Sequence, residues 1–427
     1  MNRNILEAIV VGAGHAGLSA SYYLKRLEID HVIFERGKIG ESWRSQRWDS
    51  FSLNTSNRLN LLPGDTYTGD QPECFPSAKE FAYSLEGYAS KHNLPVKEHA
   101  TVLNISKPAG QENFVVTVAE NNIIKTYQSR QVIICSGSQN IKKIPAIANR
   151  ISADIKQLHA SEYRNASTLP DGAVLVAGSA QSGCQITEDL LDAGKKVYLS
   201  TCAVARIPRR YRGKDIMDWL IKIGFFDMKT SDVTDPRMLY MPAPQVSGTG
   251  KYGHTVSLQQ LANRGAVILG RLESADLETA FFMLNACEHV RFADEFSKKV
   301  KGMVDEFISK NQLVLPAPEE DLADIPDPEA AWVSNTSSIN FKENKISSII
   351  WTTGFGKDFS YVDLPAFDKE GNPQHNEGVS AVEGLYFLGL SWLRMRKSGV
   401  IYGIKEDAEY ISNKVYQYSK EFQKVKV

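Results

Sequence analysis

The stretch VVGAGHAG, Val10–Gly17, decides how the rest of the chain is interpreted. A β-branched run precedes it and apolar residues at helical spacing follow it, which predicts a strand, a glycine turn and a helix. Gly12 permits the tight bend, Gly14 lets the backbone approach a pyrophosphate, and Gly17 allows close packing of helix on sheet. Glu35 ends the next predicted strand about 20 residues later, where a carboxylate accepts hydrogen bonds from ribose hydroxyls. This turn is therefore expected to bind FAD or NAD.

A second copy of the pattern lies at LVAGSAQSGCQ, Leu175–Gln185, again between a predicted strand and a predicted helix. Gly178 and Gly183 occupy the bend and packing positions, but Ala180 replaces the glycine of closest approach. One methyl group at this position pushes a pyrophosphate outward, which suits a dinucleotide that binds and leaves. The cofactor contacts predicted for this turn are Gly178, Ala180, Gln181, Ser182 and Gly183.

The residues after the second copy differ in charge from those after the first. The strand KKVYLST ends in Ser200 and Thr201 without a carboxylate, and Arg206 and Arg209 follow in the segment RIPRRYRGK. Hydroxyls and guanidiniums are suitable partners for a 2'-phosphate. We therefore expect NADPH at the second turn and FAD at the first. The alternative is a solvated basic loop on a degenerate turn.

The two copies predict an α/β fold with two Rossmann-like dinucleotide-binding domains of the glutathione-reductase type. Each is expected to contain a doubly wound parallel sheet, and period-two segments between 100 and 134 predict antiparallel insertions. The predicted boundaries are 1–165 for the first part of the FAD-binding domain, 166–335 for the NADPH-binding domain with an irregular or helical insertion, and 336–427 for the C-terminal part of the FAD-binding domain.

The composition argues against several classes of protein. With 49 basic and 50 acidic side chains among 427 residues, the net charge of −1 gives no electrostatic reason to expect a nucleic acid partner. The sequence contains no run of about 18 apolar residues, so we expect no membrane span and a cytoplasmic protein. The five cysteines form no C-x-x-C pair, which argues against a disulfide framework, a zinc site or a redox dithiol, and no metal is expected.

Several segments outside the two turns resemble one family. They are FERGKIGESWRSQRWDSFSLNT, RIPRRYRGKD, IIWTTGF and GLYFLGLSWLRMRKSGVIYGIKEDAEY. With the glycine turns, they make the chain similar over nearly its whole length to the flavin-containing (class B) monooxygenases, and more narrowly to bacterial CzcO-type flavoproteins. The resemblance implies FAD and NADP(H) as cofactors, and it is less specific for the reaction.

The resemblance also implies which residues surround the flavin. The family's G-x-x-W-R element matches Gly40, Trp43 and Arg44, beside the flavin or its ribityl-diphosphate. Asn54 and Thr55 fall where the family places polar groups near the isoalloxazine, and together with Arg44 they are the expected catalytic residues. Further cofactor contacts are implied at Arg36, Val102, Ser136, Gly137, Thr353, Gly354, Gly389, Ser398 and Gly399.

One family fingerprint, F-x-G-x-x-x-H-x-x-x-Y/W, is incomplete in this chain. It is present only as ADIKQLHASEY, where His159 and Tyr163 match but Ala153 and Ile155 replace the phenylalanine and the glycine. The two matching residues are equally consistent with packing of a linker. The two missing residues weaken the prediction of oxygenase activity more than the prediction of cofactor binding.

The reaction implied by the resemblance is oxygenation. Hydride passes from NADPH to FAD, O2 reacts to give a C4a-(hydro)peroxyflavin, and oxygen goes to a small soft nucleophile (an amine nitrogen or sulfur) or to a carbonyl. Two alternatives stay open: an NAD(P)H:acceptor oxidoreductase without oxygen insertion, and a flavin-bound redox sensor linked to ion transport. The expected partners are a small-molecule substrate and O2, with homodimerisation left open.

Overall fold

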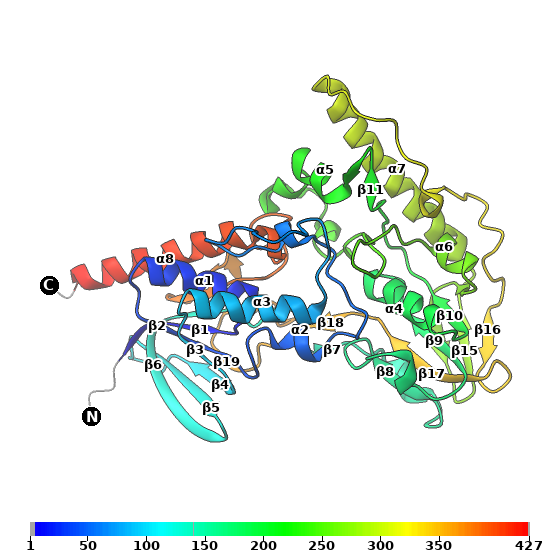
Figure 1. The fold of residues 1–427 in the computed structure, drawn as a ribbon. Coiled ribbons are helices and arrows are strands. Elements are labelled where there is room, and N and C mark those ends of the chain that lie inside the picture. Colours follow the sequence, from blue (N-terminus) through cyan, green and yellow to red (C-terminus); the bar gives the residue numbers. More distant parts are fainter. Residues whose placement is uncertain (1–4, 140, 426–427) are drawn as a thin grey trace.

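The computed structural model describes residues 5–139 and 141–425, which fold into two lobes (Figure 1). One lobe contains the N-terminal part of the chain and the C-terminal helix, drawn in blue, cyan and red. The other contains the middle of the chain, drawn in green and yellow. Each lobe has its own parallel sheet and its own glycine turn. The predicted α/β fold with two Rossmann-like domains is confirmed.

The first lobe is built on a ten-stranded sheet. Its strands are β1 (Leu6–Val11), β2 (His31–Phe34), β3 (Val96–Lys97), β4 (Ala100–Ser106), β5 (Phe114–Glu120), β6 (Ile123–Ile134), β19 (Val362–Asp363), β20 (His375–Asn376), β21 (Val379–Ser380) and β22 (Leu385–Phe387). The order β3-β2-β1-β6-β22 is parallel throughout. The predicted antiparallel insertion is the hairpin pair β4 and β5, which continues into β6.

Strand β6 joins the antiparallel part of this sheet to its parallel part. Its first half pairs antiparallel with β5 and is largely exposed, whereas its last residues pair parallel with β1 and are buried. The sequence changes accordingly, from the polar IIKTYQSR to the apolar QVII. A strand that is buried on both faces requires such a continuous apolar run.

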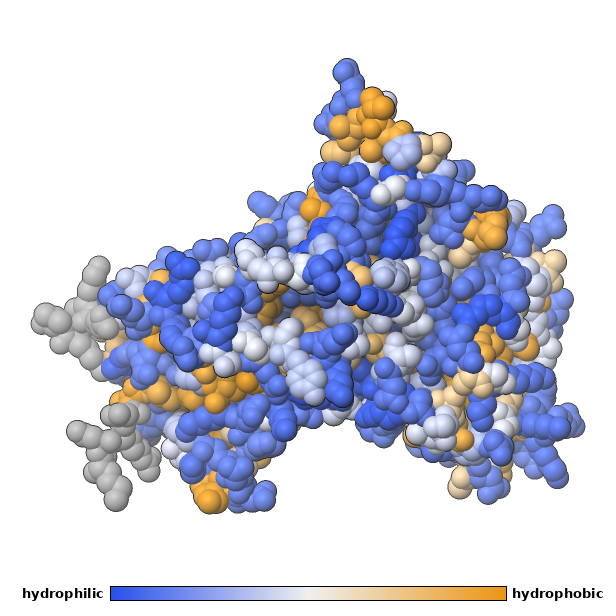
Figure 2. All heavy atoms as spheres, in the orientation of Figure 1, coloured by the Kyte–Doolittle hydropathy of each residue, from blue (hydrophilic) through white to orange (hydrophobic). Residues whose placement is uncertain are grey.

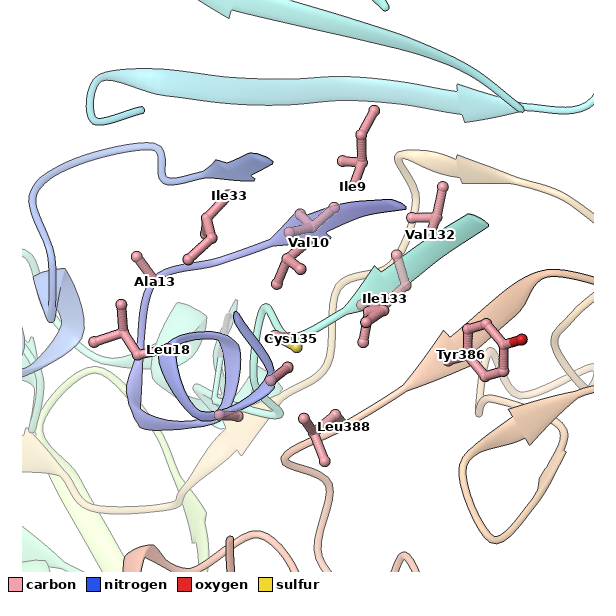
Figure 3. Close-up of a cluster of buried hydrophobic side chains, with 14 of the residues drawn as sticks. Ile9, Val10, Ala13, Leu18, Ile33, Val132, Ile133, Cys135, Tyr386 and Leu388 are labelled. Atoms are coloured by element: carbon pink, nitrogen blue, oxygen red, sulfur yellow. The ribbon is translucent and has the colours of Figure 1, made fainter. Parts of the chain in front are cut away.

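Three helices cover one face of the first sheet: α1 (His15–Arg26), α3 (Ala78–Lys91) and α8 (Ile404–Val425). Helix α3 begins with a capping box formed by Ser77 and Glu80, and α1 packs against α8. Figure 3 shows how Ile9 and Val10 of β1 lie among side chains of β6 and α1 in the core. The last helix of the chain thus completes the domain that the first strand begins.

The second lobe contains the parallel sheet β13-β10-β9-β17-β8. Its strands are β8 (Lys156–His159), β9 (Ala173–Ala177), β10 (Val197–Ser200), β13 (Val267–Leu269) and β17 (Ile346–Trp351). Both predicted domain boundaries therefore need correction. Strand β8 precedes residue 166 and β17 follows residue 335, yet both lie in this sheet because β17 is hydrogen-bonded between β9 and β8.

The chain crosses between the lobes twice, and the two crossing segments pair with each other. Strand β7 (Ile141–Lys142) lies antiparallel to β18 (Phe355–Gly356). The crossings thus form a short two-stranded ribbon directly after the Ser136 and Thr353 turns. This ribbon marks the junction of the two lobes, and the two predicted cofactor sites lie on either side of it.

The segment between β10 and β17 contains the predicted irregular and helical insertion. Its elements include β11 (Arg210–Tyr211), β12 (Lys214–Asp215), α5 (Ile216–Lys222), α6 (Leu258–Asn263), β14 (Leu272–Ala275), β15 (Thr279–Phe282), α7 (Ala286–Lys310) and β16 (Ser338–Asn340). Helix α7 projects from the lobe, and Figure 2 shows apolar side chains gathered at its far end, where Leu313 and Val314 are exposed. Across the described residues, no helix has both the length and the apolarity needed to span a membrane.

Candidate active site

The first glycine turn connects β1 to α1, and its three glycines serve different purposes. A Cβ on Gly12, which has φ of 102°, would lie 2.7 Å from the Cys135 carbonyl oxygen. A Cβ on Gly17 would lie 1.9 Å from the Gly12 oxygen. A Cβ on Gly14 would meet nothing within 4 Å, and its φ of −80° is ordinary for any residue. The fold requires the first two glycines, whereas Gly14 leaves open space in front of the helix.

The start of α1 is suited to a phosphate. No side chain caps this helix, so the first N–H groups after Gly14 lack the partner that a serine or aspartate would supply. Such groups and the positive end of the helix dipole favour an anion. The turn therefore fits a pyrophosphate on the basis of its own geometry.

Glu35 lies at the end of β2 and is held against this turn. Its carboxylate accepts hydrogen bonds from the N–H groups of Ala13 (2.8 Å) and Gly37 (3.1 Å). The side chain is buried, and desolvation raises its pKa, partly offset by these two N–H donors. A carboxylate has about four lone-pair sites, so the two oxygens retain acceptor capacity for ribose hydroxyls. The neighbouring Arg36 is exposed.

The second turn, between β9 and α4 (Gln181–Asp192), has nearly the same backbone as the first. Ala180 has φ −72° and ψ −177°, and the corresponding Gly14 has φ −80° and ψ −174°. Gly178 is again left-handed in φ, at 116°, and a Cβ on Gly183 would lie 2.0 Å from the Gly178 oxygen. Helix α4 also begins without a side-chain cap. Alanine has thus replaced glycine only where the fold does not need glycine.

The two residues after Ala180 contribute unequally to this turn. The Gln181 amide donates to the Ser247 oxygen (2.5 Å) and accepts from the Val246 N–H (2.8 Å), so it holds a neighbouring loop. Ser182 is half-buried in the first turn of α4. Only Ser182 therefore presents a side chain that is not already used by the loop.

The two arginines predicted to bind a phosphate form ion pairs with aspartates of the protein instead. The Arg206 side chain is fully buried and forms ion pairs with Asp294 (2.6 Å) and Asp324 (3.1 Å). Arg209 is also buried and pairs with Asp215. Releasing either arginine to a ligand would leave a buried carboxylate without its partner, which is costly. The structure thus corrects the assignment of these arginines to a 2'-phosphate.

The hydroxyls at the end of β10 are also occupied. Ser200 donates to the Gly270 oxygen (3.0 Å), and Thr201 donates to the Leu269 oxygen (2.7 Å). Both side chains are buried and tie β10 to the end of β13 and to Gly270, which follows it. Their predicted role at a 2'-phosphate is therefore replaced by a structural one.

Arg271 is a candidate that the motif analysis missed. It follows β13, which lies parallel to β10 with Leu269 opposite Ser200, so it stands at the same carboxyl edge of the sheet. It is exposed, and no carboxylate lies within 4 Å of it in the described part of the chain. The signal was the segment VILGR, in which an arginine directly follows a strand of the nucleotide-binding sheet.

On the flavin side, the G-x-x-W-R element forms the short helix α2 (Glu41–Ser45). Gly40, left-handed at φ 72°, begins it, and Trp43 packs edge-on against Phe81 with ring centroids 5.1 Å apart. Arg44 points to α3, where it pairs with Glu86 at 2.7 Å. The structure gives Arg44 a packing role between two helices and does not support its predicted catalytic role.

Asn54 lies where the two lobes meet. Its Oδ1 accepts a long hydrogen bond from Gln185 Nε2 of α4 (3.4 Å), and its main-chain oxygen accepts from Arg209 (3.0 Å). Thr55, by contrast, donates to the Asn60 side chain, whose amide donates back to the Thr55 oxygen (2.8 Å). Of the two predicted catalytic residues, Asn54 is at the junction and Thr55 stabilises its own loop.

The incomplete family fingerprint has a packing role. The His159 Nε2 donates to the Gly354 oxygen (2.9 Å), which ties β8 to the second crossing. Burial lowers the pKa of this histidine, which keeps it neutral. Tyr163 donates to Asp189 of α4 (2.5 Å), and Ile155 packs against the second-lobe core. These contacts support the linker interpretation of the histidine and the tyrosine.

The remaining predicted contacts are spread around the first turn. Tyr361 donates to Ser136 (2.8 Å), and a Cβ on Gly389 would lie 2.8 Å from Ala16 of α1. Ser398 accepts N–H groups of its own loop, and Val102 lies in β4 against the core. The left-handed glycines of these segments are Gly137, Gly354, Gly389 and Gly399. The segments at Ser136, Gly389 and Gly399 approach the turn, whereas Val102 is part of the sheet packing.

His15 is a second residue that the motif analysis missed, although it lies inside the glycine motif. It hydrogen-bonds the main chain of Gly399, which joins the C-terminal segment to the start of α1. Burial lowers its pKa to about 4, so the ring is neutral. Its Nε2 is buried and has no partner among the described residues.

Comparison with known proteins agrees with this geometry. A family model described as pyridine nucleotide-disulphide oxidoreductase matches residues 9–213. The uncharacterized oxidoreductase CzcO-like of Geobacillus kaustophilus is 30% identical, over 97% of this chain and 100% of its own. The chain belongs to the CzcO-like oxidoreductases.

Two further proteins are similar to this CzcO-like oxidoreductase. The probable indole-3-pyruvate monooxygenase YUCCA7 of Arabidopsis thaliana is 28% identical over 57% of this chain and 58% of its own. The structure of a flavin-containing monooxygenase from Stenotrophomonas maltophilia superposes with a TM-score of 0.65, at 18% identity, over 97% of this chain and 99% of that one. The second similarity concerns the fold alone.

Proposed function

We propose that this CzcO-like protein is an FAD-dependent, NADPH-consuming monooxygenase that oxygenates a small soft nucleophile, an amine nitrogen or sulfur, or a carbonyl. The observation that carries the proposal is the pair of uncapped helices, α1 and α4, each behind a glycine turn of matching backbone. Two such turns in one chain are needed when one dinucleotide passes electrons to another. The monooxygenase relatives support oxygen as the final acceptor.

The two turns differ in the way the proposal requires. FAD is assigned to the first turn because Gly14 leaves open space and Glu35 provides a buried carboxylate for the ribose. NADPH is assigned to the second turn because the Ala180 methyl group faces the corresponding position. A cofactor that must leave after each cycle tolerates a weaker pyrophosphate site, whereas a resident flavin does not.

In this proposal, residues of the chain orient the reacting rings and exclude water from them. FAD held at the first turn would supply the hydride-accepting and O2-activating chemistry. Asn54 and Gln185 meet between the two lobes and can orient the rings that approach there. The Trp43 and Phe81 pair and the C-terminal segment beside His15 exclude water from the flavin side.

The proposal is tested by admitting air to protein that has been reduced with NADPH under anaerobic conditions. A monooxygenase is expected to return to the oxidised spectrum slowly, through a distinct and long-lived oxygenated flavin species. An immediate return to the oxidised spectrum would instead indicate an NAD(P)H:acceptor oxidoreductase. Among the described residues all five cysteines are free, so a disulfide acceptor would have to come from another molecule.

A further inference from the structure

Arg47 is a cation for which the structure provides no anion. It follows α2, and its guanidinium lies over the rings of Trp43 (5.0 Å) and Phe51 (5.4 Å). It donates to the Gln46 main-chain oxygen (2.9 Å) and, at 3.4 Å, to Gln139 Oε1. Over 5–139 and 141–425, no carboxylate lies within 4 Å of it. Both acceptors are neutral.

This arrangement is unfavourable for the protein alone. Removing a cation even partly from water costs free energy unless an opposite charge compensates. Burial lowers the pKa of Arg47 to about 10, and no neighbouring charge acts against it. Arg206 and Arg209 differ from Arg47 in this respect. Their fully buried side chains each pair with aspartate, which compensates the charge.

Arg47 also lies beside the junction of the two lobes. Gln139 belongs to the first crossing segment, just after the Ser136–Gly137 turn. Trp48 packs into the core of the second lobe, and Ser50 donates to Asp189 of α4 (2.5 Å). Arg47 itself is only half-buried, so a ligand that enters at the junction can reach it.

The residues on either side of Arg47 are also incompletely satisfied. Gln46 Oε1 and Trp48 Nε1 are buried and have no hydrogen-bond partner within the described chain. Buried polar atoms are rarely left unpaired, and two of them on either side of a cation without a counter-charge indicate a place where a ligand completes the hydrogen bonding. The Trp48 indole N–H is a donor, as is the guanidinium, and donors favour an anionic ligand.

We propose that Arg47 binds the carboxylate of the substrate, so that this enzyme acts on organic acids whose apolar part lies against Trp43 and Phe51. The inference rests on the proposed function, because it uses the same junction. A planar guanidinium offers a carboxylate two parallel hydrogen bonds. The cofactor phosphates have their own sites at α1 and α4, which leaves Arg47 to the third reactant.

The test uses oxidised, flavin-loaded protein without NADPH. Phenylacetate and its neutral isostere phenylacetamide are titrated separately, and the flavin absorbance and the tryptophan fluorescence are followed. The acid is expected to bind at least about tenfold more tightly than the amide, the effect of one hydrogen bond to a charged group. Arg47→Met should remove this preference, and Arg47→Lys should retain part of it. The control is Arg210→Met, which removes an exposed arginine whose guanidinium donates to the main-chain oxygens of Tyr252 and Gly253.

Equal affinity of the wild-type protein for acid and amide would overturn the proposal, as would a preference that survives in Arg47→Met. Loss of FAD from Arg47→Met would show that the partner is a flavin phosphate. In a separate binding titration, a tenfold rise in the Kd for NADPH in Arg47→Met with unchanged phenylacetate binding would identify a nicotinamide-nucleotide phosphate instead. Either result also refutes a substrate carboxylate. Because these titrations involve no turnover, they are independent of the air-admission experiment that tests the proposed monooxygenase.

Discussion

The substitution Gly14→Ala separates ligand binding from folding. The new methyl group would meet no protein atom within 4 Å, and the backbone angles of −80° and −174° suit alanine. The same substitution at Gly17 would place Cβ 1.9 Å from the Gly12 oxygen. The two variants therefore differ only in whether the methyl group enters protein or the space assigned to the FAD pyrophosphate.

The magnitudes follow from these surroundings. For the protein without FAD, Gly14→Ala gains about 0.4–1 kcal/mol from the unfolded state and loses a comparable amount because alanine is a poorer N-cap. The free energy of unfolding should thus change by less than about 1 kcal/mol. With FAD, displacing the pyrophosphate from one N–H group costs about 1.5–3 kcal/mol, so the Kd for FAD should rise about 10- to 150-fold.

The assay is reconstitution of the deflavinated protein with FAD, followed by quenching of flavin fluorescence, alongside urea unfolding of the same samples. Gly14→Ala should unfold like the wild type and bind FAD weakly. Gly17→Ala should lose stability by at least about 1–3 kcal/mol, the usual cost of overpacking. Wild-type affinity for FAD in Gly14→Ala would refute the assignment of this turn.

Three further substitutions test the second lobe. Ala180→Gly should lower the Kd for NADPH about fivefold, or ~1 kcal/mol, with unchanged FAD content; an unchanged Kd would show that the methyl group does not face the nucleotide. Arg271→Ala should raise the KM for NADPH about tenfold and leave that for NADH unaltered, and equal effects on both would exclude contact with a 2'-phosphate. Arg206→Leu should destabilise the protein by about 3 kcal/mol in urea, because Asp294 loses its buried partner, without altering the KM for NADPH in the folded fraction. A stable Arg206→Leu variant with a high KM for NADPH would support the original assignment of Arg206 to the 2'-phosphate.

The glycine turns were predictable because their determinants are local. In each turn the strand, the bend and the helix lie within about 20 residues, and hard contacts decide which glycines are needed. The structure added the distinction between Gly14 and Gly17, which depends on what lies in front of the helix. That distinction is visible only in three dimensions.

The arginine assignments failed because burial is a long-range property. Arg206 is neutralised by Asp294 on α7 and Asp324 beyond it, which are 88 and 118 residues away in the sequence. The segment RIPRRYRGK contains no sign of these partners, so its arginines were predicted to be free to bind a 2'-phosphate. The same reason explains Arg44, whose carboxylate partner Glu86 lies on the next helix.

The domain boundaries failed for a different reason. Strands β8 and β17 lie just outside the two ends of the predicted second domain. They belong to the second sheet because β17 pairs with β9 and β8 pairs with β17, which no local pattern records. Asn54, in contrast, was located through family resemblance, and the structure places it against α4 at the junction.

The central claim is that two glycine turns in one chain hold two dinucleotides that exchange electrons. The most direct measurement is an anaerobic titration of the purified protein with NADPH, followed by the flavin absorbance. The account predicts a yellow protein whose flavin is fully bleached by one equivalent of NADPH. A flavin that dithionite reduces but NADPH does not, or a protein that binds NADPH and retains no flavin, would contradict it.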